Sequence, residues 1–253
     1  QDHLDWHGSA EQYYRDKLSL CTLPGVRTVV ADGDSAALRE HTDLLGPVRW
    51  VQGEADPWVE QLHLLGAHNL RNAQLAQAAL VELGVDGARD PVRLAAACAQ
   101  FTPLESRLHQ LGEVDGVSFV DDSLSTNVLP TLAAVAAFPG RRVALLVGGF
   151  DRGIDYRPLG IGLAGRPDLL VLTMPDNGPA IGAPLRDLGI DVVDCDDLEQ
   201  AVRLGREWAG QGGVVLLSPA APSFGRYADY RARAAAFAMA MRHGGSRISE
   251  VDS

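Results

Sequence analysis

Short apolar runs alternate with helical patterns along most of the chain. Four runs in its second half are continuously apolar, as is typical of strands that a sheet buries on both faces. They are residues 142–147, 169–172, 191–193 and 214–217. Helical patterns that start at Leu129, Ala180, Leu198 and Tyr227 fill the intervals. The alternation predicts an α/β fold with a largely parallel sheet and helices on its faces.

A pair of segments at the start of this half predicts a β-hairpin. Residues 107–113 and 117–120 flank Val114-Asp115-Gly116, in which the glycine can take the positive φ of a tight turn. With this hairpin included, residues 104–253 hold the elements of a complete doubly wound domain.

The first 103 residues predict the remainder of a different domain. Two short strand candidates, 26–31 and 48–52, are separated by a helical pattern over 35–45. An Ala- and Leu-rich helix over 69–83 and a shorter one over 91–99 follow. Gln100-Phe101-Thr102-Pro103 then predicts a hinge, because proline disfavours continued helix on both sides of itself.

Composition narrows the class of protein. Of 253 residues, 46% are hydrophobic and 22% charged, which is ordinary for a soluble globular protein. The formal net charge of -11 argues against a duplex nucleic-acid binder, and no apolar run approaches the ~18 residues of a membrane span. Three widely spaced cysteines predict free thiols in a reducing compartment. We therefore expect a cytoplasmic protein that binds neither nucleic acid nor membrane.

Small and polar residues follow three of the predicted strands. Residues 121–127 (Asp-Asp-Ser-Leu-Ser-Thr-Asn), 148–153 (Gly-Gly-Phe-Asp-Arg-Gly) and 218–225 (Ser-Pro-Ala-Ala-Pro-Ser-Phe-Gly) each come directly after an apolar run. Taken singly, the 148–153 segment could be a tight turn, and the 218–225 segment an ordinary loop capped by Ser223. Because the carboxyl ends of parallel strands converge on one edge of such a sheet, the set predicts one ligand site. Its donors and acceptors suit a ribose, a polyphosphate and a charged substrate.

Two constellations in the first half could also bind ligands. Asp2-His3-Leu4-Asp5 carries imidazole and carboxylate groups, which bind divalent metals, although a solvated turn or a helix cap is the alternative. Lys17 could contact a phosphate, or bridge metals if it is carbamylated. Asn69 and Asn72 lie three residues apart on one helix face and could pair with the edge of a base. N-capping of the helix by Asn69 is equally compatible with the pattern.

Taken in order, these motifs resemble those of the Mur ligase family, the ATP-dependent amide ligases of peptidoglycan precursor synthesis. The matching segments span nearly the whole chain. Each motif alone is a modest signal, but the set in this order is specific for the family. They are Asp2-His3-Leu4-Asp5 with Lys17, Gly66-x-His68-Asn69-x-x-Asn72, Leu104-x-x-Arg107-Leu108, Asp121-Asp122-Ser123-x-x-Thr126-Asn127, Gly148-Gly149-x-Asp151-Arg152-Gly153-x-Asp155-Tyr156 and Leu217-Ser218-Pro219-Ala220.

The resemblance implies a fold, an activity and a cellular role. Residues 1–103 would be the C-terminal part of the ATP-binding central domain, and 104–253 a complete Rossmann-like glutamate-binding domain. The implied enzyme phosphorylates the carboxylate of UDP-N-acetylmuramoyl-L-alanine with ATP, and the amine of glutamate attacks the acyl phosphate. This step serves cell wall biogenesis, cell shape and cell division. The substrates are small molecules, and a monomer is expected.

The resemblance also assigns roles to individual residues. His3 would be a Mg²⁺ ligand, and Lys17, as its carbamate, would support a second metal ion. Asn69 and Asn72 would contact the adenine. Arg107 and Asp122 would contact the phosphates and the ribose of the nucleotide. The pocket for the incoming glutamate falls on Thr126, Arg152, Ser223 and Tyr230.

Two departures from the family pattern change these expectations. The domain that grips the UDP-sugar and the Gly-Lys-Thr/Ser phosphate loop are not in this sequence, so we expect a fragment that is inactive alone. Lysines of the D-glutamate-adding enzymes are replaced by Leu124 and Arg152, and their Ser-x-Asp by residues 223–225. Arginine binds a carboxylate through a planar fork and lysine as a point charge, so the pocket is altered. These changes favour the branch that uses L-glutamate.

Two further classes remain open from the sequence. One is a non-catalytic module that binds a nucleotide or an amino acid, which would fit the missing phosphate loop. The other is a relative of the folylpolyglutamate synthetases, which share the same domain plan.

Overall fold

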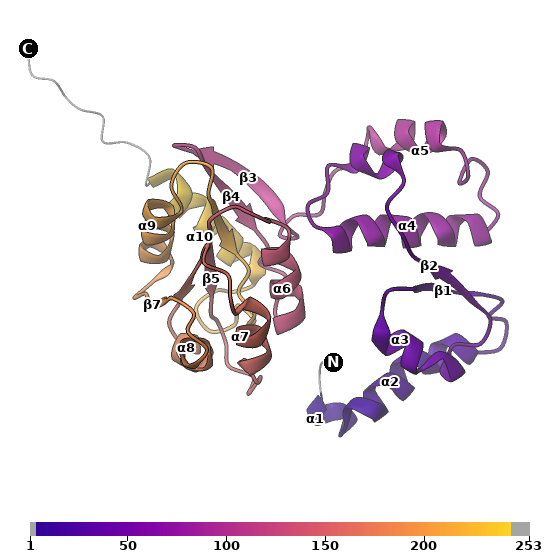
Figure 1. Cartoon of the computed structure of the whole chain (residues 1–253), viewed down its shortest axis with the longest axis horizontal. Coiled ribbons are helices and arrows are strands. Elements are labelled where there is room, and N and C mark those ends of the chain that lie inside the picture. Colours follow the sequence, from indigo (N-terminus) through magenta and orange to yellow (C-terminus); the bar gives the residue numbers. More distant parts are fainter. Residues whose placement is uncertain (1–3, 244–253) are drawn as a thin grey trace, which may run out of the picture. The chain divides into compact units, whose positions relative to one another are not determined.

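The computed structural model describes residues 4–243, and the chain divides into two compact units between Thr102 and Pro103 (Figure 1). This boundary falls within the tetrapeptide in which the sequence predicts a hinge. No helix in the described part of the chain is long and apolar enough to cross a membrane.

The second unit is built on a six-stranded sheet with the strand order β3-β4-β8-β5-β6-β7. β3 (His109–Val114) pairs with β4 (Val117–Asp121) in antiparallel fashion, and the other neighbours are parallel. These are β8 (Val214–Leu217), β5 (Val143–Val147), β6 (Leu169–Thr173) and β7 (Val192–Asp194). Asp115 and Gly116 form the β3–β4 turn with φ of 51° and 77°. The predicted hairpin, the α/β class and the largely parallel sheet are confirmed.

Helices cover both faces of this sheet (Figure 1). α6 (Val128–Ala136), α7 (Arg157–Leu163) and α8 (Gly178–Asp187) pack in succession along one face, whereas α9 (Leu198–Ala209) and α10 (Tyr230–His243) pack against each other on the opposite face. The central strands are buried on both sides, as their continuous apolar runs predict. Alternate β5 residues, Ala144 and Leu146, join the core under α9 and α10.

Close contact between α9 and the sheet depends on a glycine. A methyl group placed on Gly205 would lie 3.0 Å from Leu172 and 3.2 Å from Ala144. A side chain there would push the helix away from the strands that end at the candidate site.

The helices differ from the sequence prediction in several places. α10 begins at Tyr230, not at Tyr227, because the Asp229 carboxylate accepts a hydrogen bond from Ala232 N at 2.8 Å and starts the helix there. The interpretation of Ser223 as the cap of this helix is therefore wrong. The pattern over 35–45 forms only α3 (Ala36–Glu40) and the 3₁₀ turn η2 (Thr42–Leu44). α7 was not predicted at all.

The first unit holds a parallel pair of strands, β1 (Val29–Asp32) and β2 (Val48–Val51). α4 (Ala67–Glu82) packs against both strands. A small core around Trp58 and Val59 joins the 3₁₀ helix η3 (Pro57–Leu62) to α5 (Pro91–Cys98). α1 (Leu4–His7), α2 (Ala10–Leu18) and the 3₁₀ helix η1 (Ser19–Thr22) precede these elements.

Candidate functional site

Three strand ends meet at one edge of the six-stranded sheet. β4, β8 and β5 are parallel neighbours, so the loops that follow them lie side by side. Backbone hydrogen bonds join the three loops: Asp122 N donates to Leu217 O at 2.8 Å, and Gly148 N donates to Pro219 O at 2.9 Å. After β7, the outermost strand, the chain returns to β8 between β4 and β5. The carboxyl ends of these central strands therefore lie at a topological switch point, where doubly wound folds bind ligands.

The Asp122 carboxylate is buried and fully engaged within the protein. Its Oδ2 accepts hydrogen bonds from Ser125 Oγ at 2.5 Å and Ser218 Oγ at 2.7 Å, and its Oδ1 accepts one from Leu108 N at 3.2 Å. Only 4% of the residue is exposed, and burial raises the pKa of this carboxyl above its ordinary value despite these bonds. In this structure Asp122 orders the loops around the candidate site.

The neighbouring Asp121 performs the same task on the other side of the loop. Its carboxylate accepts hydrogen bonds from Ser106 Oγ at 2.7 Å and from both the amide and the hydroxyl of Ser123, at 3.0 and 2.6 Å. Many hydrogen bonds of the polar residues that the sequence predicts to bind a ligand are therefore made among those residues themselves. They form the floor of the site.

The residues assigned to a glutamate pocket differ in exposure. Ser223 is buried, Thr126 and Tyr230 are half-buried, and Arg152 is exposed, with its guanidinium carbon 6.0 Å from the Phe224 ring. Ser223 lines a cavity of about 40 Å³ next to the glycine pair that follows β5. The other residues around this cavity include Met174, Asp176, Phe224, Arg226, Tyr227 and Arg233.

Sequence reasoning missed Asn177, which holds the glycine loop in place. Its Oδ1 accepts a hydrogen bond from Gly149 N at 2.8 Å, and its Nδ2 donates to the Tyr156 hydroxyl at 2.9 Å. Burial, together with the nearby charge of Asp151, raises the pKa of Tyr156 to about 12, so the phenol stays protonated. Tyr156 belongs to the Gly148-to-Tyr156 motif, but nothing in the sequence pairs it with an asparagine 21 residues later.

Arg107 projects from a strained segment. It is exposed, and its neighbours Ser106 and Leu108 have positive φ values of 59° and 46°. Ser106 O accepts a hydrogen bond from Leu124 N at 3.1 Å, which ties this segment to the loop after β4. The backbone around Arg107 is therefore held against the loop after β4.

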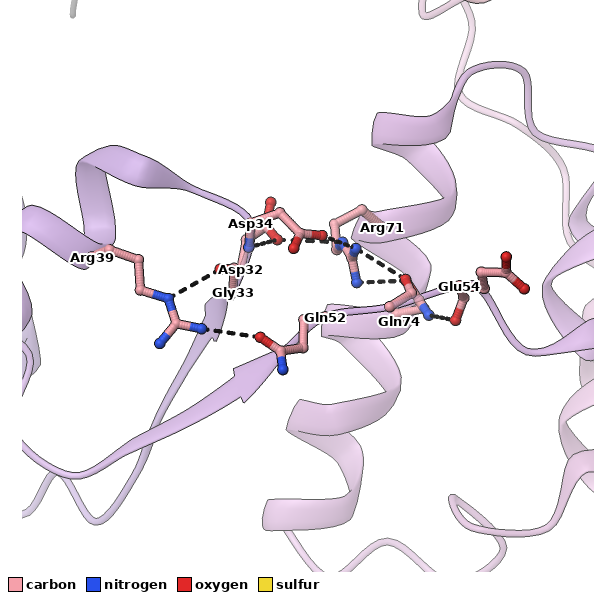
Figure 2. Close-up of polar contacts among 9 residues, drawn as sticks. Asp32, Gly33, Asp34, Arg39, Gln52, Glu54, Arg71 and Gln74 are labelled. Atoms are coloured by element: carbon pink, nitrogen blue, oxygen red, sulfur yellow. Dashed lines mark hydrogen bonds and ion pairs between the residues drawn. The ribbon is translucent and has the colours of Figure 1, made fainter.

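In the first unit, Arg71 joins the carboxyl ends of β1 and β2 to α4 (Figure 2). Its guanidinium forms ion pairs with Asp32, at 3.3 Å, and with Asp34, and it donates to Gly53 O at 3.1 Å. A further bond joins Arg71 to Gln74 Oε1 at 3.0 Å. The start of α4, which carries both candidate adenine contacts, is thus fixed to the two strand ends.

Asn69 and Asn72 lie near the start of α4. The helix is preceded by Gly66, with φ of 85°, and Asn69 donates its Nδ2 to Leu65 O at 2.9 Å. N-capping by Asn69 is therefore wrong, because its side chain acts as a donor from inside the helix. Asn72 directly follows Arg71, and its side chain is exposed.

The candidate metal ligands are described only in part. His3 lies outside the described residues. Lys17 is exposed on α2, with its Nζ 5.8 Å from the Tyr13 ring. Within residues 4–243 there is no group of three or more His, Cys, Asp or Glu side chains placed to hold a metal ion. The roles of His3 and Lys17 stay predictions.

The fold has counterparts among solved structures. The chain matches the UDP-N-acetylmuramate-alanine ligase of Thermotoga maritima with a TM-score of 0.62, over 96% of this chain and 57% of that one at 16% identity. It matches the MurF ligase of T. maritima in complex with ADP with a TM-score of 0.63, over 96% and 60% at 15% identity. The fold is therefore that of a Mur ligase.

Sequence comparison is more specific. The chain is 43% identical, over 99% of its length, to the UDP-N-acetylmuramoyl-L-alanine–L-glutamate ligase of Xanthomonas oryzae pv. oryzae, and 40% identical over 95% to that of Salinispora tropica. The chain belongs to the Mur ligase family. It spans 57% and 58% of the length of these two relatives. No family model matches it.

Proposed function

We propose that this chain is the nucleotide- and glutamate-binding part of an ATP-dependent ligase that adds L-glutamate to UDP-N-acetylmuramoyl-L-alanine. The observation that carries the proposal is 43% identity, over 99% of the chain, to relatives that bear this name. Residues 1–103 would be the C-terminal part of the ATP-binding domain, and residues 104–253 the glutamate-binding domain.

The proposed reaction has two steps. The carboxylate of UDP-N-acetylmuramoyl-L-alanine attacks the γ-phosphorus of ATP, which gives an acyl phosphate and ADP. The amine of glutamate then attacks the carbonyl carbon, and phosphate leaves with the C–O bonding pair as the amide forms. Magnesium would neutralise charge on the phosphates, with His3 and carbamylated Lys17 as the ligands that the family implies.

The described residues suit different parts of this chemistry. Asn72 is exposed at the start of α4 and can meet the edge of the adenine, with Asn69 beside it. Arg107 is an exposed cation for the nucleotide phosphates, as the sequence suggests. Asp122 would support the binding of the ribose indirectly, because it orders the loop in which it lies.

The preference for L-glutamate is the finer part of the proposal. Leu124 and Arg152 change the number and type of cations available to the two carboxylates of glutamate. Arg152 is exposed and free to turn from Phe224 toward a carboxylate, whereas Leu124 offers only apolar surface. A monomer, and closure of the two units about residues 101–103, stay predictions from the same resemblance, and a cytoplasmic location stays a prediction from the composition.

The test uses the full-length protein that contains this chain. Phosphate release is measured with ATP, Mg²⁺, UDP-N-acetylmuramoyl-L-alanine and either enantiomer of glutamate. We expect release that requires all components and is faster with L-glutamate. Arg152→Met should raise the KM for L-glutamate at least about tenfold, and Arg157→Met, an exposed arginine at the start of α7, should leave it unchanged. No glutamate-dependent release would favour a non-catalytic binding module.

A further inference from the structure

Arg233 is a buried arginine at the centre of the strand-end loops. It lies on α10 and is only 1% exposed, although α10 places other arginines in solvent. Taking a guanidinium out of water is costly unless its donors are bonded within the protein. Arg233 therefore needs a structural or functional reason for its position.

The guanidinium bonds to the backbone of all three loops. Its Nη2 donates to Ser123 O in the loop after β4, at 2.8 Å. Its Nη1 donates to Ala221 O in the loop after β8, at 3.1 Å, and reaches Gly148 O after β5 at 3.5 Å. A single planar group thus links loops that are far apart in sequence.

The loops approach one another so closely around this group that no side chain fits between them. A methyl group on Gly149 would lie 2.1 Å from Pro222 O and 3.2 Å from Arg233 Nη1. The small cavity lined by Ser223 and this glycine pair lies directly against the arginine. Burial lowers the pKa of Arg233 to about 10, which still leaves it charged at neutral pH, and the nearby charge of Asp121 favours the charged form.

We propose that Arg233 is a positioning residue for glutamate: its fork sets the spacing of the three loops that carry the glutamate pocket. The inference rests on the proposed function above, because it deepens the account of the same site. Lysine carries all its donors on one nitrogen, whereas the two terminal nitrogens of the arginine fork reach carbonyl groups of different loops at the same time. Loss of the fork should therefore affect the binding of glutamate more than that of ATP.

The test compares Arg233→Lys and Arg233→Met with Arg242→Lys and Arg242→Met in the full-length protein. Arg242 is exposed on the same helix and serves as the matched control. Steady-state kinetics with each substrate varied in turn should show the KM for L-glutamate raised about tenfold or more by Arg233→Met, and less by Arg233→Lys. The KM for ATP should stay within about twofold, and the Arg242 variants should match the wild type.

A second measurement addresses the loops directly. Amide exchange in peptides that cover 121–127, 148–153 and 218–225 should become faster in all three together in Arg233→Lys, and in none of them in Arg242→Lys. Equal changes in every KM, an unchanged KM for glutamate, or faster exchange confined to α10 would overturn the inference. Failure of both Arg233 variants to fold would also overturn it, because the arginine would then serve stability alone. Absence of glutamate-dependent activity in the wild type would instead refute the proposed function.

Discussion

Replacing Asp122 by alanine tests whether the strand-end loops are held by an internal carboxylate. The change removes the acceptor of three hydrogen bonds, from Ser125 Oγ, Ser218 Oγ and Leu108 N. Bonds to a charged acceptor contribute about 1.5–3 kcal/mol each, and a buried donor left without a partner costs about 1–3 kcal/mol.

Two effects reduce the total. The Ser218 hydroxyl can turn to Thr131 Oγ1, which lies 3.1 Å away. The carboxylate's own burial, which raises its pKa, no longer opposes folding. The Leu108 amide has no such freedom, because its backbone is fixed at a φ of 46°. We therefore expect a net loss of about 3 kcal/mol for Asp122→Ala, and about half of that for Asp122→Asn, which keeps one acceptor oxygen.

The assay is equilibrium urea unfolding of the full-length protein, followed by pulsed amide exchange in β4 and β8, which reports on this unit separately. Asp187→Ala is the control, since Asp187 is an exposed aspartate at the end of α8; it should change stability by less than about 0.5 kcal/mol. A loss below about 1 kcal/mol for Asp122→Ala would refute the reasoning that the carboxylate bonds hold the loops.

Three further predictions concern other parts of the chain. Leu145→Ala should destabilise the second unit by about 3 kcal/mol in urea unfolding, because the side chain is fully buried in β5; a loss under 1 kcal/mol would contradict this. Hydrogen bonding to Arg166 holds the pKa of Asp168 below its ordinary value. The ion pair therefore stabilises the folded state above pH ~4, and this stabilisation is lost as the pH falls further. Asp168→Asn should lower the free energy of unfolding by about 1 kcal/mol at pH 7, and the stabilities of variant and wild type should converge near pH ~2. A difference in stability that does not depend on pH would argue against the ion pair. Arg71→Met should cost about 2 kcal/mol of stability and raise the KM for ATP more than that for glutamate, because it leaves Asp32 at the end of β1 without its ion pair and no longer ties the start of α4 to the strand ends; equal effects on both KM values would contradict this.

The sheet and the place of the candidate site could be predicted from the sequence, because both follow from local patterns. Strands buried on both faces leave continuous apolar runs, and the residues after 120, 147 and 217 change at once to small and polar types. α7 escaped prediction because Pro158, Gly160 and Gly162 dilute its helical pattern within seven residues.

The internal bonding of the site could not be predicted in this way. Asp122 bonds to a serine 96 residues away, and no local pattern pairs them. Arg233 leaves a weaker signal in the sequence. It lies four residues before Phe237 and eight before Met241, on the apolar face of the last helix. A charge on such a face predicts a buried polar role, although its partners depend on how the three loops meet.

The central claim is that the protein joins L-glutamate to UDP-N-acetylmuramoyl-L-alanine. The most direct measurement gives the full-length protein ATP, Mg²⁺, the UDP-sugar and an equal mixture of the two glutamate enantiomers. The product is then isolated, hydrolysed and analysed for the chirality of its glutamate. The account predicts a product whose glutamate is overwhelmingly the L form, with one ADP formed per amide bond. A product whose glutamate is mainly the D form or an equal mixture of both, or ADP formed without any amide product, would contradict it.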